Sequence, residues 1–158
     1  MEKFLGEDKV LKAVVGPVSI QTSRTGERVK IAGAKRVSFI INVGVGSGTN
    51  AHSFVLKQHD AASSGNSHDL EVAHPYYHKV DDADAFTKVD VTTATATYDL
   101  HTIMGEDMAI VVFEVLAEDL RSDCKWVSLD VGAAGAAQIG SVLAVVDPDF
   151  KPAYEQVV

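Results

Sequence analysis

Two neighbouring runs of the chain alternate apolar and polar residues with the period of an extended strand. In residues 36–45, five apolar side chains recur at every second position: Val37, Phe39, Ile41, Val43 and Val45. Because successive side chains of a strand point to opposite sides, these five gather on one face. Residues 50–58 form the second run, and the turn-rich residues 46–49 join the two. The pair is therefore predicted to form a β-hairpin.

Length and composition indicate one globular domain. A chain of 158 residues buries roughly two thirds of the surface that its unfolded form exposes, so it needs no disulfide or metal to be stable. The apolar fraction of 46% and the charged fraction of 23% are ordinary for globular proteins. We expect a single domain over residues 1–158.

The net charge argues against a nucleic-acid partner. Fourteen basic and twenty-two acidic residues give a charge of -8, which repels phosphate unless the basic residues gather on one face. The densest basic group, Arg28, Lys30, Lys35 and Arg36, is interleaved with apolar residues. We expect a solvated strand face there and no nucleic-acid partner.

The cysteine count and the N-terminus give further expectations. Cys124 is the only cysteine, so no intramolecular disulfide can form, and no histidine lies near it in sequence as a base. An inert cysteine at a strand end is predicted. The first nine residues are charged where a signal peptide is apolar, and no window has the length of a membrane span. We expect synthesis in the cytoplasm and no membrane partner.

Other segments also have strand patterns. Residues 10–15 and 18–21 are apolar runs separated by Gly16 and Pro17, and with 29–32 they predict an early hairpin. Further strands are predicted at 86–91, 92–98, 125–131 and 139–146, with 92–98 at an edge or surface. Residues 109–116 are more continuously apolar and predict a central strand, with the start of a short helix through 120 as the alternative.

Two kinds of segment lack this periodicity. Residues 60–84 are rich in Ser, Gly, Asn, His and Asp and predict an extended loop excursion with one short strand; binding residues often lie on such loops. Residues 1–9 and 149–158 are predicted to be arms.

Eight to ten short strands with turns between them indicate an all-β fold. We predict a two-layer β-sandwich, jelly-roll-like, with extended terminal arms. No helices alternate with the strands, which excludes a parallel α/β sheet.

The six histidines raise the question of a metal site. His74 and His78 have an i, i+4 spacing, which would align them on a helix, but Pro75 argues against a helix there. On a strand they would be roughly 13 Å apart, too far for one ion. We expect loop histidines that contact backbone or water, with His52 and His59 at the surface. No metal and no cofactor are predicted.

The carboxylates and glycines also lack a catalytic or binding pattern. Asp81, Asp82 and Asp84 do not have the ligand spacing of a calcium loop, so a solvated turn is predicted. Glu114 with Glu118 and Asp119 are candidates for the acid and base of a glycosidase, but a surface strand end is the better interpretation. The glycines of residues 44–48 precede no helix that would complete a phosphate site. We therefore expect no catalytic residues and no enzyme.

Five segments together resemble small structural proteins of tailed phages. These are residues 39–44 (FIINVG), 51–60 (AHSFVLKQHD), 112–120 (VFEVLAEDL), 126–131 (WVSLDV) and 139–147 (IGSVLAVVD). The resemblance spans about residues 37–147 and rests on strand patterns. It implies a virion component, most like a capsid decoration or cement protein on the capsid exterior, made in the host cytoplasm, with the major capsid protein as partner.

Under that resemblance, certain residues are the expected contacts. Phe150 and Tyr154 of the C-terminal arm are aromatic anchors for pockets of the capsid. His74, Tyr76, Tyr77 and His78 are the expected loop contacts. A homo-oligomer, dimer or trimer, is also expected.

Two other functions remain open from the sequence. A head-tail connector or tail-tube subunit would also be a virion β protein, and would form rings. A carbohydrate-binding β-sandwich would need exposed aromatic rings to stack on sugars, for which Tyr76, Tyr77 and Trp126 are the candidates, although Trp126 also fits the core.

Overall fold

The computed structural model describes residues 9–46, 52–81, 83–105 and 107–148. The predicted arms at 1–9 and 149–158 lie outside these residues, Lys9 excepted. The strands are β1 (Val10–Ser19), β2 (Val29–Lys30), β3 (Ala34–Val43), β4 (Ser53–His59), β5 (Ser67–Asp69), β6 (Tyr76–Val80), β7 (Thr87–Val89), β8 (Thr97–Asp99), β9 (Ala109–Leu116), β10 (Trp126–Val131) and β11 (Ile139–Pro148). Two short helical segments are α2 (His101–Met104) and the 3₁₀ turn η1 (Ala117–Asp119).

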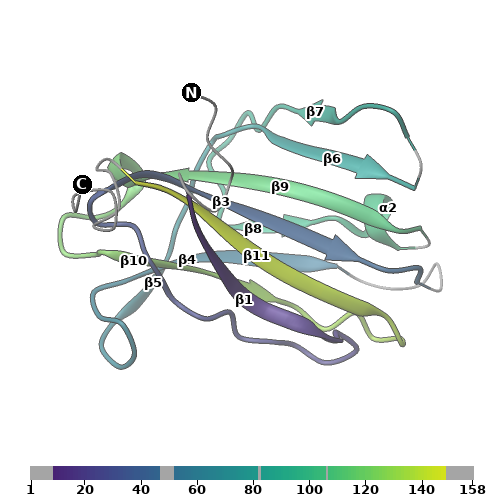
Figure 1. Ribbon diagram of the computed structural model, residues 1–158, viewed down its shortest axis with the longest axis horizontal. Coiled ribbons are helices and arrows are strands. Elements are labelled where there is room, and N and C mark those ends of the chain that lie inside the picture. The colour runs from purple at the N-terminus through teal and green to yellow at the C-terminus, as the bar shows by residue number, and fades with distance from the viewer. Residues whose placement is uncertain (1–8, 47–51, 82, 106, 149–158) are drawn as a thin grey trace, which may run out of the picture.

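The strands form two antiparallel sheets packed on each other (Figure 1). One sheet has the order β1-β11-β3-β9-β6-β7, and the other has β2-β10-β4-β5 with β8 beside β4. The first strand pairs with the last, β2 with β10, β3 with β9, and β4 with β5. That nested pairing is the order of a jelly roll. The predicted all-β, jelly-roll-like sandwich is confirmed. Strands β6, β7 and β8 are additional to this nested set, with β6 and β7 in the first sheet and β8 in the second.

The core consists of the inward-facing residues of both sheets. Val37, Phe39, Ile41 and Val43 of β3 are all exposed by 1% or less, as their alternation predicts. They belong to the same buried cluster as Leu129 and other side chains of the facing sheet. Each such side chain contributes roughly 1.5–3 kcal/mol by leaving water. Val45 does not continue the pattern, because β3 ends at Val43 and Val45 is 67% exposed.

The hairpin predicted between residues 36–45 and 50–58 is wrong. β3 pairs with β11 and β9, whereas β4 pairs with β10, β5 and β8 in the other sheet. Each strand has a row of alternate apolar side chains, and because the chain crosses between the layers, both rows face the same core. Phe39 and Phe54 are both fully buried in this way. The alternation of the two runs is equally compatible with either arrangement.

The predicted early hairpin is wrong for the same reason. β1 pairs with β11, and β2 pairs with β10 in the other sheet. β1 also runs through Gly16 and Pro17 as one strand, with register shifts between Ala13 and Val15 and between Val15 and Val18. Because β1 is an edge strand, the missing N–H of Pro17 and the irregular register are tolerated.

The predicted excursion at 60–84 contains more regular structure than expected. It includes two strands, with β5 in one sheet and β6 in the other. Residues 109–116 form the predicted strand β9, and the helix alternative is limited to the single turn η1 that follows. β10 and β11 are also confirmed. The strand predicted at 92–98 is shorter, since only β8 and an isolated bridge between Val72 and Thr95 form there.

A short segment around Gly26 joins the two sheets along one side of the sandwich. The N–H of Glu27 donates to the Val14 carbonyl of one sheet at 3.0 Å, and the N–H of Gly26 donates to Asp130 of the other at 2.9 Å. A Cβ on Gly26 would lie 2.2 Å from the Leu129 carbonyl oxygen. Backbone approaches this closely only where there is no side chain.

We predict that Gly26→Ala lowers the free energy of unfolding by about 1–3 kcal/mol, because the methyl group forces this segment away from β10. Gly16→Ala is the matched control, since no atom lies within 4 Å of its Cβ position. It should leave stability unchanged or slightly raised. Urea denaturation of both variants measures the difference, and equal stabilities would show that the contact at Gly26 is not a constraint.

Candidate functional site

The predicted contact residues Tyr76, Tyr77 and His78 lie on β6, so their placement in a loop is wrong. β6 pairs with β9, with Tyr77 opposite Val112 and His78 opposite the buried Val111. Since neighbouring side chains alternate, Tyr76 and His78 point toward the interior and Tyr77 points away from it. The four predicted contacts therefore do not form one loop surface.

Tyr76 belongs to an aromatic cluster that links the two sheets. Its ring lies 5.3 Å from that of Phe113 on β9 and 6.0 Å from that of Tyr98 on β8, and the last two are 4.5 Å apart. Burial raises the pKa of Tyr98 to about 12 and also raises the pKa of Tyr76. Such packed rings stabilise a core by their contact area and edge geometry.

His74 lies in the loop before β6 and is held by η1. Its Nε2 is 2.8 Å and 3.0 Å from the two carboxylate oxygens of Asp119. The same carboxylate accepts the N–H of Leu116 at 2.7 Å. The pair thus fixes the loop before β6 against the end of β9.

Nδ1 of His78, by contrast, is buried without a hydrogen-bond partner among the described residues.

His52 and His59 are buried, so their predicted surface placement is wrong. Nε2 of His52 is hydrogen-bonded to Oε1 of Gln138, and Nε2 of that glutamine donates to the carbonyls of Gly44 and Met104. His59 lies between two hydroxyls, with Nδ1 2.7 Å from Oγ of Ser67 and Nε2 2.8 Å from Oγ of Ser128. Both histidines hold segments of the sandwich together.

The loop that follows β4 is held by Arg28, which shares the hydroxyl of Ser67 with His59. The guanidinium donates to the carbonyl oxygens of Ala61, Ser63 and Ser64 at 2.8, 3.1 and 2.7 Å. Burial lowers the pKa of His59 below its ordinary value of 6.5, and Arg28 lowers it further, while Asp130 opposes them. Arg28 belongs to the densest basic group of the sequence, but in the fold its side chain stabilises this loop.

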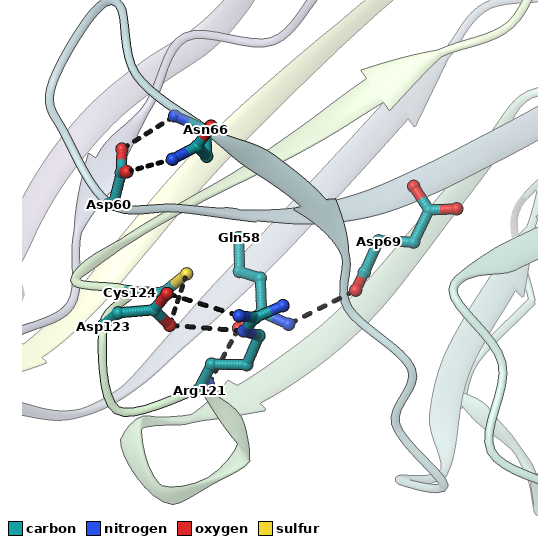
Figure 2. A network of polar contacts seen from close by, with 7 residues as sticks. All are labelled: Gln58, Asp60, Asn66, Asp69, Arg121, Asp123 and Cys124. Carbon is teal, nitrogen blue, oxygen red and sulfur yellow. Dashed lines mark hydrogen bonds and ion pairs between the residues drawn. The ribbon is translucent and has the colours of Figure 1, made fainter.

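A polar network closes the end of the sandwich beside β5 (Figure 2). Gln58 accepts the N–H of Arg121 at 2.8 Å and donates to the carbonyl of Asp69 at 3.3 Å. Arg121 pairs with Asp123, and the Cys124 thiol is directed at the same carboxylate. Burial raises the pKa of Cys124, and Asp123 raises it further. A protonated, buried thiol fits the predicted inert cysteine.

The carboxylates considered for catalysis have structural partners. Glu114 on β9 pairs with Arg36 at 3.3 Å and accepts the Ser38 hydroxyl at 3.2 Å. Asp119 is engaged by His74 and by the backbone of Leu116. Within the part of the chain that the structure describes, no three His, Cys, Asp or Glu side chains gather as metal ligands. None of the described helices has the length and apolar character of a membrane-spanning helix.

The six-stranded sheet has an apolar side that faces away from the core, which we call the outer face. One row crosses four strands, with Leu143 of β11 opposite Ile40 of β3, Ile40 opposite Val112 of β9, and Val112 opposite Tyr77 of β6. None of the four is among the core residues, and Leu143 is 36% exposed. Leu11 of β1 lies opposite Val145 of β11, and the two begin a second apolar row beside the first, toward the β1 edge.

The outer face is hollowed at the β6 side. Tyr77, Phe86 and Val112 line a shallow, wholly apolar depression of about 220 Å³. A smaller hollow of about 90 Å³ lies nearby and has Asn42, Lys79 and Asp81 among its lining residues. Of the predicted contacts, Tyr77 is thus the one that the structure places on an exposed apolar surface.

Sequence reasoning missed the outer face, although a signal for it was present. The runs around Ile40 and Val112 are apolar at consecutive positions and not only at alternate ones, so both faces of β3 and β9 have apolar side chains. This pattern is the one that predicted a central strand at 109–116. In the described residues, one side is covered by the other sheet and the opposite side is the outer face.

Comparisons with known proteins find a likeness in structure only. No protein-family model matches the chain, and no curated protein matches it either. The chain is similar to a crystal structure of the SPBc2 prophage-derived protein YomS, with 9% sequence identity and a TM-score of 0.44. That similarity covers 87% of this chain and 93% of that chain.

The buried position of His59 predicts a pH-dependent stability. Because the folded-state pKa lies below 6.5, the unfolded chain binds this proton more readily. The stabilisation is complete above pH 6.5 and is lost as the pH falls through the interval between that value and the folded-state pKa. His59→Gln should reduce the loss of unfolding free energy in this interval, measured by urea denaturation across pH. His68→Gln, a half-buried histidine on β5, should keep the wild-type pH dependence. If wild type and His59→Gln had the same pH dependence, protonation of His59 would not be the cause of the loss of stability.

Proposed function

We propose that the chain is a non-enzymatic structural protein of a tailed-phage virion that binds the outside of the capsid and stabilises it. The strand patterns shared with small virion proteins support the class. The jelly-roll sandwich supports it as a rigid scaffold, although jelly rolls serve many functions and the fold alone assigns none. The observation on which the proposal mainly rests is the corner at which the described part of the chain begins and ends, with Lys9 beside Asp147.

That corner is built by Asp147. Its carboxylate accepts a hydrogen bond from Nζ of Lys9 at 2.5 Å and lies 3.4 Å from Nε of Arg36. The hydrogen bond from Lys9 lowers the pKa of Asp147. These contacts tie the start of β1 to the end of β11 and to β3. The two ends of the described chain, at Lys9 and Pro148, therefore lie side by side on the scaffold.

The segments next to this corner in sequence, residues 1–8 and 149–158, are the proposed attachment to a large assembly. The sandwich keeps its shape, while the segments supply contact residues such as Phe150 and Tyr154 to pockets of the major capsid protein. These two residues lie outside the described part of the chain, so their role is a proposal from sequence. The structure describes the corner itself, which is formed by Lys9, Arg36 and Asp147.

The carbohydrate-binding alternative is less well supported. Stacking on a sugar needs aromatic rings exposed on one surface. Tyr76 is packed against Phe113 and Tyr98, whereas Tyr77 and Trp126 belong to different sheets. The three candidates do not form a common platform. A glycan array that gave specific binding would reverse this preference.

Removing residues 149–158 should weaken binding to empty capsid shells without unfolding the domain. The test is co-sedimentation of the full chain and the truncated chain with shells assembled from the major capsid protein of the same genome. Circular dichroism and thermal melting confirm that the truncated chain is folded. Binding of the full chain that is lost on truncation supports the proposal.

Two results would count against this function. If the full chain does not bind the shells, the decoration role is wrong. If both chains bind equally well, the C-terminal segment is not the contact. Asp147→Asn serves as a second variant, because it weakens the ion pairs of the corner and leaves the tail intact. It should reduce binding less than the truncation does.

A further inference from the structure

We propose that the outer face of the six-stranded sheet is a two-fold interface with the same face of a second copy of this chain. The inference does not depend on the virion role, because it concerns the isolated chain. It rests on three properties of the outer face: its apolar rows, its balanced charge and its dimensions.

The apolar rows are broad enough for a sheet to pack on. Leu143, Ile40, Val112 and Tyr77 cross four neighbouring strands in register, and the depression at Tyr77, Phe86 and Val112 extends the row toward β7. Phe86 is 49% exposed. Contiguous apolar patches of this kind on a folded domain mark interaction surfaces.

The charges on this face are balanced, unlike those of the chain as a whole. The chain has a net charge of -8, so two copies repel each other over most approaches. On the outer face, Asp147 is paired with Lys9 and Arg36, and Arg36 is also paired with Glu114. Lys88 at the β7 edge is paired with Asp90. Lys79 and Asp81, which line the smaller hollow, add one charge of each sign. Two acidic molecules can therefore approach here with little net repulsion between the two faces.

The geometry favours a second copy as the occupant. The six strands lie about 4.8 Å apart and range from ten residues in β1, β3 and β11 to three in β7, so with a rise of roughly 3.3 Å per residue the face covers on the order of 600 Å². That area is at the lower end of the roughly 600–1,000 Å² per partner of a stable interface. A second copy has the same twist, so the two faces can stack as aligned sheets do. A two-fold axis that lies in the interface and runs parallel to the strands would place the β6–β7 side of each copy over the β1–β11 side of the other.

Sedimentation equilibrium or light scattering of the full chain tests this interface. We expect a mass twice that of the 16.8 kDa chain, which falls toward the single-chain mass on dilution. Leu143→Glu should weaken association on the order of a hundredfold or more, because the carboxylate would be buried without a partner. Phe86→Ser should weaken it to a smaller extent by removing an exposed ring from the depression.

Val10→Glu is the matched control. Val10 is 51% exposed on β1 of the same sheet, but it lies opposite the inward-facing Val146 and so is not on the outer face. This variant should associate as the wild type does. Circular dichroism confirms folding, and if Leu143→Glu does not fold, Phe86→Ser decides the result. A wild-type chain that is monomeric at all concentrations, a ring-sized mass, or a dimer unaffected by both outer-face variants would overturn the proposal.

Discussion

The burial of apolar strand faces between two sheets is the constraint on which the rest of this structure depends. β3 alone contributes four side chains that are almost completely removed from water, and every other strand of the jelly roll is placed so that such faces meet. Local pairing is subordinate to this requirement. β3 and β4 are neighbours in sequence and carry hairpin-like signals, yet they lie in opposite sheets because that arrangement turns both apolar faces to one core.

The sequence was sufficient to predict the all-β sandwich and most of its strands, since a period of two is a local property that can be read directly. It was insufficient to predict pairing. The partners of β1 and β2 are β11 and β10, more than ninety residues away in sequence, and nothing in the alternation of residues 10–21 encodes that distance. The hairpins inferred from nearby runs failed at this point.

Predictions for individual polar residues were less successful, because burial of a polar side chain depends on what folds over it. His59 looks like any strand-end histidine in the sequence, but in the fold it is buried and its two ring nitrogens are hydrogen-bonded to serine hydroxyls. Tyr76 and Tyr77 are identical neighbours in sequence. β6 turns one into an aromatic cluster and the other onto the outer face, which only the strand pairing decides.

The pairing of the first strand with the last also has a kinetic consequence. β1 has no neighbour in its sheet until β11 is available, so during synthesis the first strand emerges long before its partner does. An unpaired strand of ten residues with apolar side chains is a template for non-native association with other chains. Pro17 has no backbone N–H and so interrupts the row of donors on this strand, which lowers its capacity to pair with other chains during that interval.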